Sequence, residues 1–384
     1  MSVEIKQYVD NKKELQEKIL KFVLDEEDAN DEFNNLIEYI EKQIKVEENP
    51  EELKLLLNLI SRISNNHYRH KTFISKIFKI LSSLEQNIKK LIPNHRVFNI
   101  FKTNKLVLLF LFQKKIIIPD ENIINYIITQ TKFNYDVYFY EEIKPYINKT
   151  KEKIIENKLT QLNQNSTEYF EENRQKGEND SYICYLIRND LVEEFVIYVN
   201  KNNLLLSKKI SSSIFETNSF LLKNQDKTTL IEYSAFYGSI QIFQYLILNN
   251  VVLESSLWLY AIHGNNPELI HILERNNVEL PRKSYNDCFK ESVKCHHNEM
   301  AYYFKNIIDS IKMKYSIRFG FIKNSMKYSF RYCNYEFFPA ILVQKHLVYF
   351  YCKYGYLKIV DLYFKNYGFN VNEPIISNDF FLIK

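Results

Sequence analysis

The sequence contains very little glycine and proline. Its 384 residues include only 6 Gly and 8 Pro, against 29 Tyr and 28 Phe. An all-β chain needs many Gly and Pro residues in its turns, so their scarcity favours helices joined by turns built on Asn and Asp. Asn is also the best substitute for Gly where a helix ends in the left-handed conformation. We therefore predict an all-α protein.

The sequence also lacks a strong charge imbalance and a long apolar run. The net charge of +4, from 51 basic and 47 acidic residues, is too small to indicate a nucleic-acid or anionic membrane partner. The longest apolar run, residues 106–112, is far shorter than the ~20 residues that span a bilayer. The five Cys are scattered, and residues 1–16 lack the apolar core of a signal peptide. These absences predict reduced thiols in the cytoplasm, with the nucleus left open.

Helical periodicity and breaks divide the chain into three predicted segments. One apolar stripe recurs at helical spacing in residues 53–63, and another runs from Phe73 to Ile88. Pro145 then predicts an end to the helical pattern, because proline breaks a helix interior. We predict a helical N-terminal domain at residues 1–147, a polar linker or exposed helix at 148–180, and repeats at 181–384.

Self-similarity is the main feature of the segment after residue 180. Residues 229–251 contain Ala235 at a small position, Gly238 in a turn, an apolar second helix and a closing Asn-Asn pair. Residues 257–278 repeat this plan with Ala261, a turn at Asn265 and another Asn-Asn pair. A fifth copy at 349–371 has its turn at Gly355. The plan predicts stacked pairs of helices.

The turns set the period of the repeat. Six positions are taken as equivalent: Asp190, Gly238, Asn265, His296, Cys333 and Gly355. Their spacings of 48, 27, 31, 37 and 22 have a mean of 33, which is the ankyrin period. The uneven spacings require insertions or lost loops, and we expect the largest insertion between Asn200 and Asp226.

Two stretches carry a resemblance to a known family. Residues 235–243 and 261–280 look like divergent ankyrin-like proteins expanded in some unicellular eukaryotes, whose associated domain has no assigned function. Residues 55–70, 98–111 and 141–148 resemble the helical leader of those proteins. The Thr-Pro-Leu-His signature of ordinary ankyrin repeats is replaced by Thr-Leu-Ile-Glu at 229–232, so the His that normally ties neighbouring repeats is missing.

The resemblance implies a binding function. Ankyrin repeats bury a continuous core between neighbours and present a concave surface to partner proteins. We therefore predict a non-catalytic scaffold that uses this surface to bind an unidentified protein, without a cofactor. The alternative is a structural solenoid that associates with a second copy of itself.

A second alternative is a metal protein or an enzyme. Cys288, Cys295, His296 and His297 offer metal ligands within ten residues, but they lack the short paired spacing of zinc sites. His263 and His271 occupy repeat positions, where packing or surface roles are the usual ones. No phosphate loop, nucleophile elbow or His-Glu-x-x-His motif occurs. We therefore predict no catalytic and no metal residues.

The aromatic residues are predicted to pack in the core. The tract at 135–140 and the cluster at 349–356 would need a basic groove to stack on bases, and the first has acidic neighbours. Trp258 stands on the first helix of a repeat, where it is expected to anchor the core.

Overall fold

The chain is helical throughout the part that the computed structural model describes, residues 3–25, 30–67, 69, 72–162, 167–224, 226–281, 284–315, 321–339 and 345–367. The all-α prediction is confirmed. Within those ranges, β structure is limited to one isolated bridge between Lys209 and Thr229. No described helix combines the length and the apolar character needed to cross a membrane.

The chain forms two compact units. Unit 1 contains residues 1–62, 69–83 and 310–384, and unit 2 contains residues 63–68 and 84–309. The boundaries that we predicted at 147 and 180 therefore lie inside unit 2. The predicted end of the repeats, beyond residue 367, lies outside the described residues.

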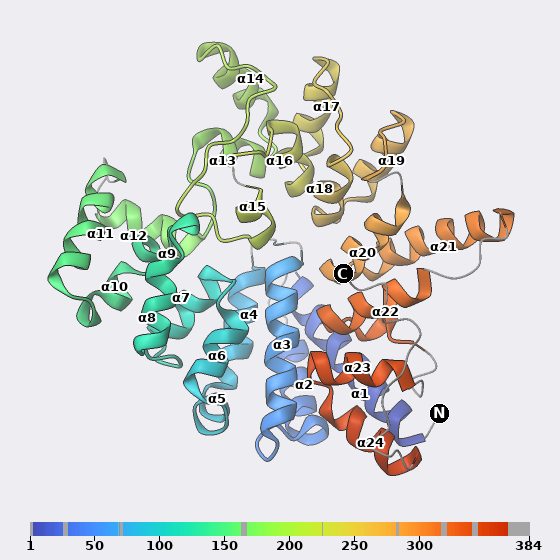
Figure 1. The fold of residues 1–384 in the computed structure, drawn as a ribbon. Coiled ribbons are helices and arrows are strands. Elements are labelled where there is room, and N and C mark those ends of the chain that lie inside the picture. Colours follow the sequence, from blue (N-terminus) through green and yellow to red (C-terminus); the bar gives the residue numbers. More distant parts are fainter. Residues whose placement is uncertain are drawn as a thin grey trace. The chain divides into compact units, whose positions relative to one another are not determined.

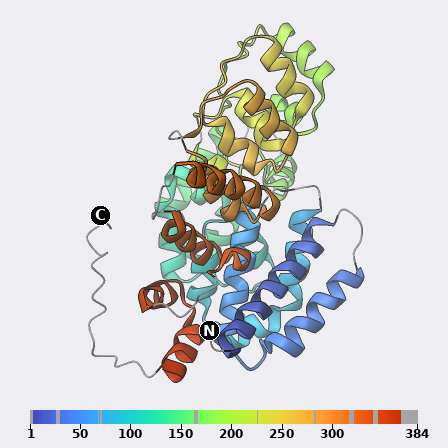
Figure 2. The same cartoon turned by 90° about the vertical axis from the view of Figure 1, so that its right-hand side faces the viewer.

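Unit 1 combines helices from both ends of the chain. They are α1 (Val3–Leu24), α2 (Asn30–Tyr39), a π-helical turn η1 (Ile40–Ile44), α3 (Pro50–Asn66, which runs on into unit 2), α4 (Phe73–Ser83), α22 (Phe321–Tyr332), a 3-10 turn η5 (Tyr335–Phe337), α23 (Lys345–Tyr354) and α24 (Leu357–Tyr367). The predicted apolar stripe of α3 is buried, from Leu53 to Ile63. Helix α1 contacts α2, α4, α24 and η5 (Figure 2). The N-terminal and C-terminal segments thus share one core.

Buried polar bonds tie the two ends together within unit 1. Gln16 of α1 donates from Nε2 to Asn334 Oδ1 at 3.2 Å and accepts the Tyr335 amide at 2.7 Å. Lys12 on the same helix is paired with Glu52 of α3. All five side chains are buried. Because a buried polar group must find a partner, these bonds fix the register of α1.

Unit 2 begins with a run of short helices. They are α5 (Glu85–Leu91), α6 (Asn94–Phe101), α7 (Lys105–Gln113), α8 (Glu121–Thr129), η2 (Thr131–Phe133), α9 (Tyr135–Tyr138), α10 (Tyr140–Ile143), η3 (Lys144–Tyr146), α11 (Lys149–Leu162) and α12 (Thr167–Lys176). Residues 135–140 are all buried, which confirms the core packing expected of that aromatic tract.

The segment 148–180, predicted to be a polar linker or an exposed helix, belongs to unit 2. It forms α11 and α12, and Phe170 and Arg174 of α12 are buried. The Arg174 guanidinium donates to Glu142 at 2.9 Å, to Glu171 at 3.0 Å and to the Tyr138 carbonyl at 3.0 Å. The segment looked like a linker because its composition is polar, yet its arginine neutralises carboxylates that would otherwise lack a partner charge.

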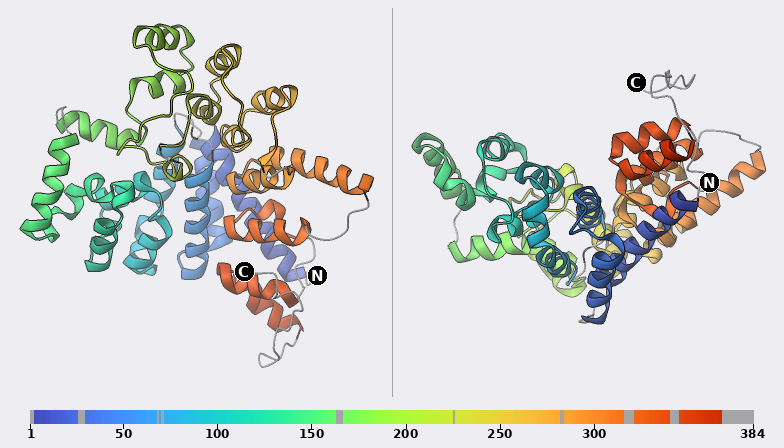
Figure 3. Two further views of the ribbon diagram at one scale, coloured as in Figure 1. Left: turned by 45° about the horizontal axis from the view of Figure 1, so that its top comes forward. Right: turned by 90° about the horizontal axis from the view of Figure 1, so that it is seen from below.

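The second part of unit 2 consists of helix pairs. The first helix of each pair is called the inner helix and the second the outer helix. The pairs are α13 (Tyr182–Arg188) with α14 (Val192–Lys201), α16 (Leu230–Tyr237) with α17 (Ile240–Leu248), α18 (Leu257–His263) with α19 (Pro267–Arg275), and α20 (Tyr285–Cys295) with α21 (Asn298–Tyr315, which extends beyond the unit). Inner helices contact one another in chain order, and α14 contacts α17. The outer helices α14, α17 and α19 stand in a row (Figures 1 and 3).

The expected insertion separates the first two pairs. It contains the bridge at Lys209 and a short helix, α15 (Ser219–Lys223). Asn218 caps α15 by accepting the amides of Phe220 and Leu221. The insertion is therefore ordered, and its position decides which surface of the pairs is accessible.

Candidate functional site

The turn between the two helices of a pair is the same in successive pairs. All six positions that the repeat spacing makes equivalent have a positive φ, between 48° and 81°. In most of them the next amide bonds to the carbonyl five residues back, as from Ser239 to Ser234 at 2.9 Å and from Tyr356 to Tyr351 at 2.8 Å. This is the Schellman arrangement that ends a helix in the left-handed conformation.

Small residues stand where adjacent inner helices meet. Ala235 of α16 and Ala261 of α18 are completely buried, and the two helices are in contact. Gly264, at the end of α18, lies so close to α16 that an added Cβ would be 2.4 Å from the Ala235 carbonyl oxygen. A side chain there would push the pairs apart, so the small residues set how closely the pairs stack.

A side-chain hydrogen bond ties successive pairs. Ser239 donates from Oγ to the Ile187 carbonyl, and His297 donates from Nδ1 to the Ile262 carbonyl at 2.8 Å. Each donor comes directly after the left-handed residue of its own pair. Each acceptor carbonyl lies three residues before the left-handed residue of the previous pair. These bonds join the first pair to the second and the third pair to the fourth.

Asp190 provides a further tie between the first two pairs. Its carboxylate oxygens accept the amides of Gln241 and Ile242, each at 3.0 Å. These amides lie in the first turn of α17, where a helix has no internal acceptors. Asp190 of the first pair thus caps the outer helix of the second, and its negative charge also suits that helix end.

The inner helices of the central pairs are covered by the insertion. Every residue from Leu230 to Phe236 of α16 is buried. The ring of Phe220 on α15 lies 5.9 Å from that of Phe236, 4.8 Å from Tyr260 and 4.1 Å from His263. Helix α15 therefore covers part of the inner helices α16 and α18.

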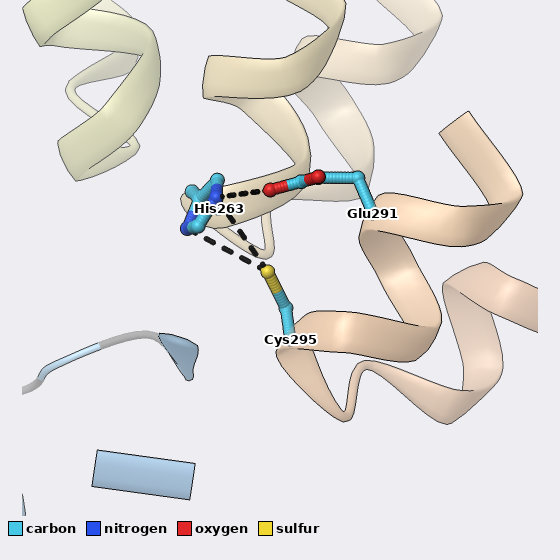
Figure 4. A group of neighbouring side chains, drawn as sticks. All are labelled: His263, Glu291 and Cys295. Carbon is cyan, nitrogen blue, oxygen red and sulfur yellow. Dashed lines mark hydrogen bonds and ion pairs between the residues drawn. The ribbon is translucent and has the colours of Figure 1, made fainter. Parts of the chain in front are cut away.

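A buried group of His263, Glu291 and Cys295 joins the third and fourth pairs (Figure 4). His263 ends α18, whereas Glu291 and Cys295 lie one turn apart on α20. His263 Nε2 is 2.7 Å from Glu291 Oε1, and Lys294 also contacts Glu291. The side chain of His263 is 1% exposed and that of Glu291 is 17% exposed. The group is another contact between neighbouring inner helices.

Burial determines the protonation of this group. Burial lowers the pKa of His263, and Glu291 only partly opposes it. Burial would raise the pKa of Glu291, but Lys294 and His263 outweigh it and lower that pKa to about 2. Burial raises the pKa of the Cys295 thiol well above its usual range. The group therefore combines a neutral imidazole, a carboxylate and a protonated thiol, which is a poor nucleophile.

The three side chains bring one ligand atom each to within 4.8 Å of one another. Cys295 Sγ is 3.5 Å from Nδ1 and 3.7 Å from Nε2 of His263. Because the lone pairs of the two ring nitrogens point apart, an atom almost equally distant from both lies along neither. His263 Nε2 already bonds to Glu291 Oε1, so the sulfur contacts the imidazole without aligning with either ring lone pair.

The ligand set that the sequence analysis considered and set aside is dispersed in the structure. Of Cys288, Cys295, His296 and His297, only Cys295 belongs to this group. His297 instead ties the pairs, and its ring lies 4.5 Å from that of His67. His271 is exposed, as a surface role predicts. Glu291 was missed, although its spacing of four residues from Cys295 on one helix was a usable signal.

Sequence reasoning also missed a buried lysine in the other part of unit 2. Lys105 of α7 is completely buried between the rings of Tyr135 and Tyr138. Its Nζ donates to the Ile214 carbonyl at 3.2 Å. Burial lowers its pKa to about 7, although Glu216 and Asp136 act in the opposite direction. With no exposed surface, this amine is placed to hold residues 214–216 against α7 and α9.

Comparisons with protein-family models, with curated proteins and with solved structures found no match to this chain.

Proposed function

We propose that the chain binds another protein through the row of helix pairs α13–α14, α16–α17 and α18–α19, without catalysis and without a cofactor. The observation that supports this proposal is the repetition of exposed positions on the outer helices. Counted back from the left-handed residues Asn203, Asn250 and Asn277 that follow the outer helices, the positions six residues earlier are all exposed, and so are those two residues earlier. The first set is Ile197, Gln244 and His271, and the second is Lys201, Leu248 and Arg275. A row of tied pairs holds such positions at fixed spacing, as recognition surfaces of repeat proteins require.

The surface used differs from the concave face expected from the sequence. Helix α15 covers α16 and α18, so a partner reaches the outer helices and the loops that follow them. These elements carry side chains of varied chemistry on a common backbone, which is how repeat proteins acquire specificity. We place the protein in the cytoplasm, where its thiols stay reduced.

Two other functions remain as alternatives. A structural solenoid would associate with a second copy of itself, and a light-scattering mass that stays monomeric at all concentrations would remove it. A metal protein would use His263, Glu291 and Cys295, in place of the Cys288, Cys295, His296 and His297 set weighed from the sequence. Stoichiometric zinc in the purified protein, lost in Cys295→Ser, would restore that alternative.

The test of the proposed function is chemical crosslinking and capture from the native cell. The variant Ile242→Asp places a charge in the core between α14 and α17, because Ile242 is completely buried. The matched control is Gln244→Asp, which adds the same charge at an exposed position of the same helix. We expect the same partner with the wild type and the control, and its loss with Ile242→Asp. Absence of any saturable partner for the wild type would contradict the proposal.

A further inference from the structure

The most exposed large apolar side chains described in unit 2 belong to two neighbouring outer helices and the loops that follow them. Leu248 is 80% exposed, Leu205 74%, Val252 70% and Ile197 65%, and the next, Ile118, is 60% exposed. All four lie on α14, on α17 or on the loops that follow them. Single exposed apolar residues are ordinary, but a group on one edge marks an interaction site.

The repeat geometry places these residues on the same edge. Helices α14 and α17 end at left-handed Asn203 and Asn250, and Leu205 and Val252 each follow two residues later. The helices are in contact, so equivalent positions are about 10 Å apart, the usual spacing of packed helices. Leu248 is the last residue of α17. The edge therefore presents three aliphatic side chains within reach of one short segment.

Three basic residues lie within four positions of Leu205 along the chain. Lys201, Lys208 and Lys209 are exposed, and residues 195–213 contain no Asp or Glu. Within the described part of the chain, no carboxylate forms an ion pair with these three lysines. The loop that follows α17 carries one acidic residue near Val252, Glu254. We call Leu205, Leu248 and Val252 with these lysines the tip patch.

Resting on the proposed function, we propose that the tip patch binds an acidic segment of a partner protein that carries aliphatic side chains. The aliphatic residues supply contact area, and the lysines attract and orient carboxylates. A lipid surface fits less well, because each lysine contributes only about 1 kcal/mol to anionic membrane binding and the patch has none of the aromatic anchors of interfacial proteins.

The probe for this proposal is a phage-displayed library of random 12-residue peptides, selected against the full chain. We expect enriched peptides that combine Asp or Glu with Leu, Ile or Val. Their binding is then measured by fluorescence anisotropy with two double variants, Leu205→Ser with Val252→Ser and Lys208→Glu with Lys209→Glu. Each should weaken binding about tenfold, because patch residues at the centre of an interface dominate affinity. All four positions are exposed, so circular dichroism should show unchanged folding.

A matched control uses the opposite end of α14. Glu193 and Glu194 are exposed there, and Glu193→Lys with Glu194→Lys should leave peptide binding unchanged. Peptides without the acidic and aliphatic bias, or binding that both patch variants retain, would overturn the proposal. Binding to phosphatidylserine vesicles that the lysine variant abolishes, without any selected peptide, would assign the patch to lipid. Patch-dependent dimerisation would assign it to a second copy of the chain.

The two proposals fail in different ways. If the patch variants still capture the partner that Ile242→Asp loses, the tip patch is wrong and the scaffold function stands. If the wild-type chain captures no partner and selects no peptide, both proposals are wrong.

Discussion

The helix pairs of unit 2 and the last pair of unit 1 share a local design but have different neighbours. In unit 2, Ser239 and His297 each follow a left-handed turn and bond to a carbonyl of the preceding pair. In unit 1, Tyr356 does the same to the Phe330 carbonyl at 2.8 Å, but Asn334 bonds to Gln16 of α1. The turn is thus a local property of the chain, whereas the group it contacts depends on which helix packs beside it.

The largest expected difference between the two regions is the loss of stability when a glycine is replaced by alanine. Gly264→Ala should destabilise unit 2 by about 3 kcal/mol, because the new Cβ meets the Ala235 carbonyl at 2.4 Å and backbone must move. Gly355→Ala in unit 1 should cost about 1 kcal/mol, since only its φ of 81° is strained and no atom lies within 4 Å. Urea unfolding with hydrogen exchange read separately in each unit measures both. The reverse order would contradict the close approach of α16 and α18.

Removing the distinctive tie of unit 1 should have the next largest effect. Gln16→Leu deletes a buried bond to Asn334 and the acceptor of the Tyr335 amide, which should cost about 2 kcal/mol. The matched change in unit 2, Ser239→Ala, removes one hydroxyl bond and should cost about 1 kcal/mol. Exchange protection of α1 should fall in the first variant and not in the second. Equal protection of α1 in both would show that Gln16 does not hold the chain ends together.

A cap between pairs should matter only in unit 2. Asp190→Ala removes the acceptor of two amides of α17 and should cost about 1 kcal/mol. Asp190→Asn keeps an oxygen acceptor and tolerates the left-handed backbone, so it serves as the control. The melting temperature of each variant gives the comparison. A loss as large in Asp190→Asn would mean that charge, and not capping, is the stabilising interaction.

The smallest effect is a pH dependence from the contact between α18 and α20. Burial lowers the pKa of His263, with Glu291 opposing it and Lys294 and Lys223 adding to it. The folded chain therefore binds fewer protons than the unfolded chain below the unfolded pKa of about 6.5. Stability should fall as the pH drops from 7 to 6, by at most about 0.7 kcal/mol for this residue. Denaturation at both pH values should show a smaller drop in His263→Gln, and an identical drop would contradict this assignment.

Local features of the fold were predictable from the sequence. Three sequence features report local backbone conformation. They are the few glycines, the Asn-Asn endings and the spacing of 27 residues between Gly238 and Asn265. The burial of Trp258 and the exposure of His271 follow from helical periodicity in the same way. Such patterns are short-range, and one sequence contains them in full.

Long-range pairing was not predictable. Nothing in residues 1–24 indicates that α1 packs against α24, because its apolar stripe suits any neighbouring helix. The polar segment around Arg174 looked like a linker because its charge partners, Glu142 among them, come from another helix. Likewise, Phe220 gives no sign in the sequence that it lies against His263. One sequence shows which residue types a candidate site can contain. It does not show which distant residues pack against them.

The discontinuous make-up of unit 1 has a consequence for synthesis on the ribosome. Gln16 and Tyr335 are 319 residues apart in the chain yet share a hydrogen bond. At about 5–20 residues per second, α1 emerges roughly 16–64 s before η5 is made. During this interval the apolar face of α1 lacks one of its native partners, while residues 84–309 can already fold. The apolar face of α1 is therefore a surface that chaperones can bind until the C-terminal part of its core has been synthesised.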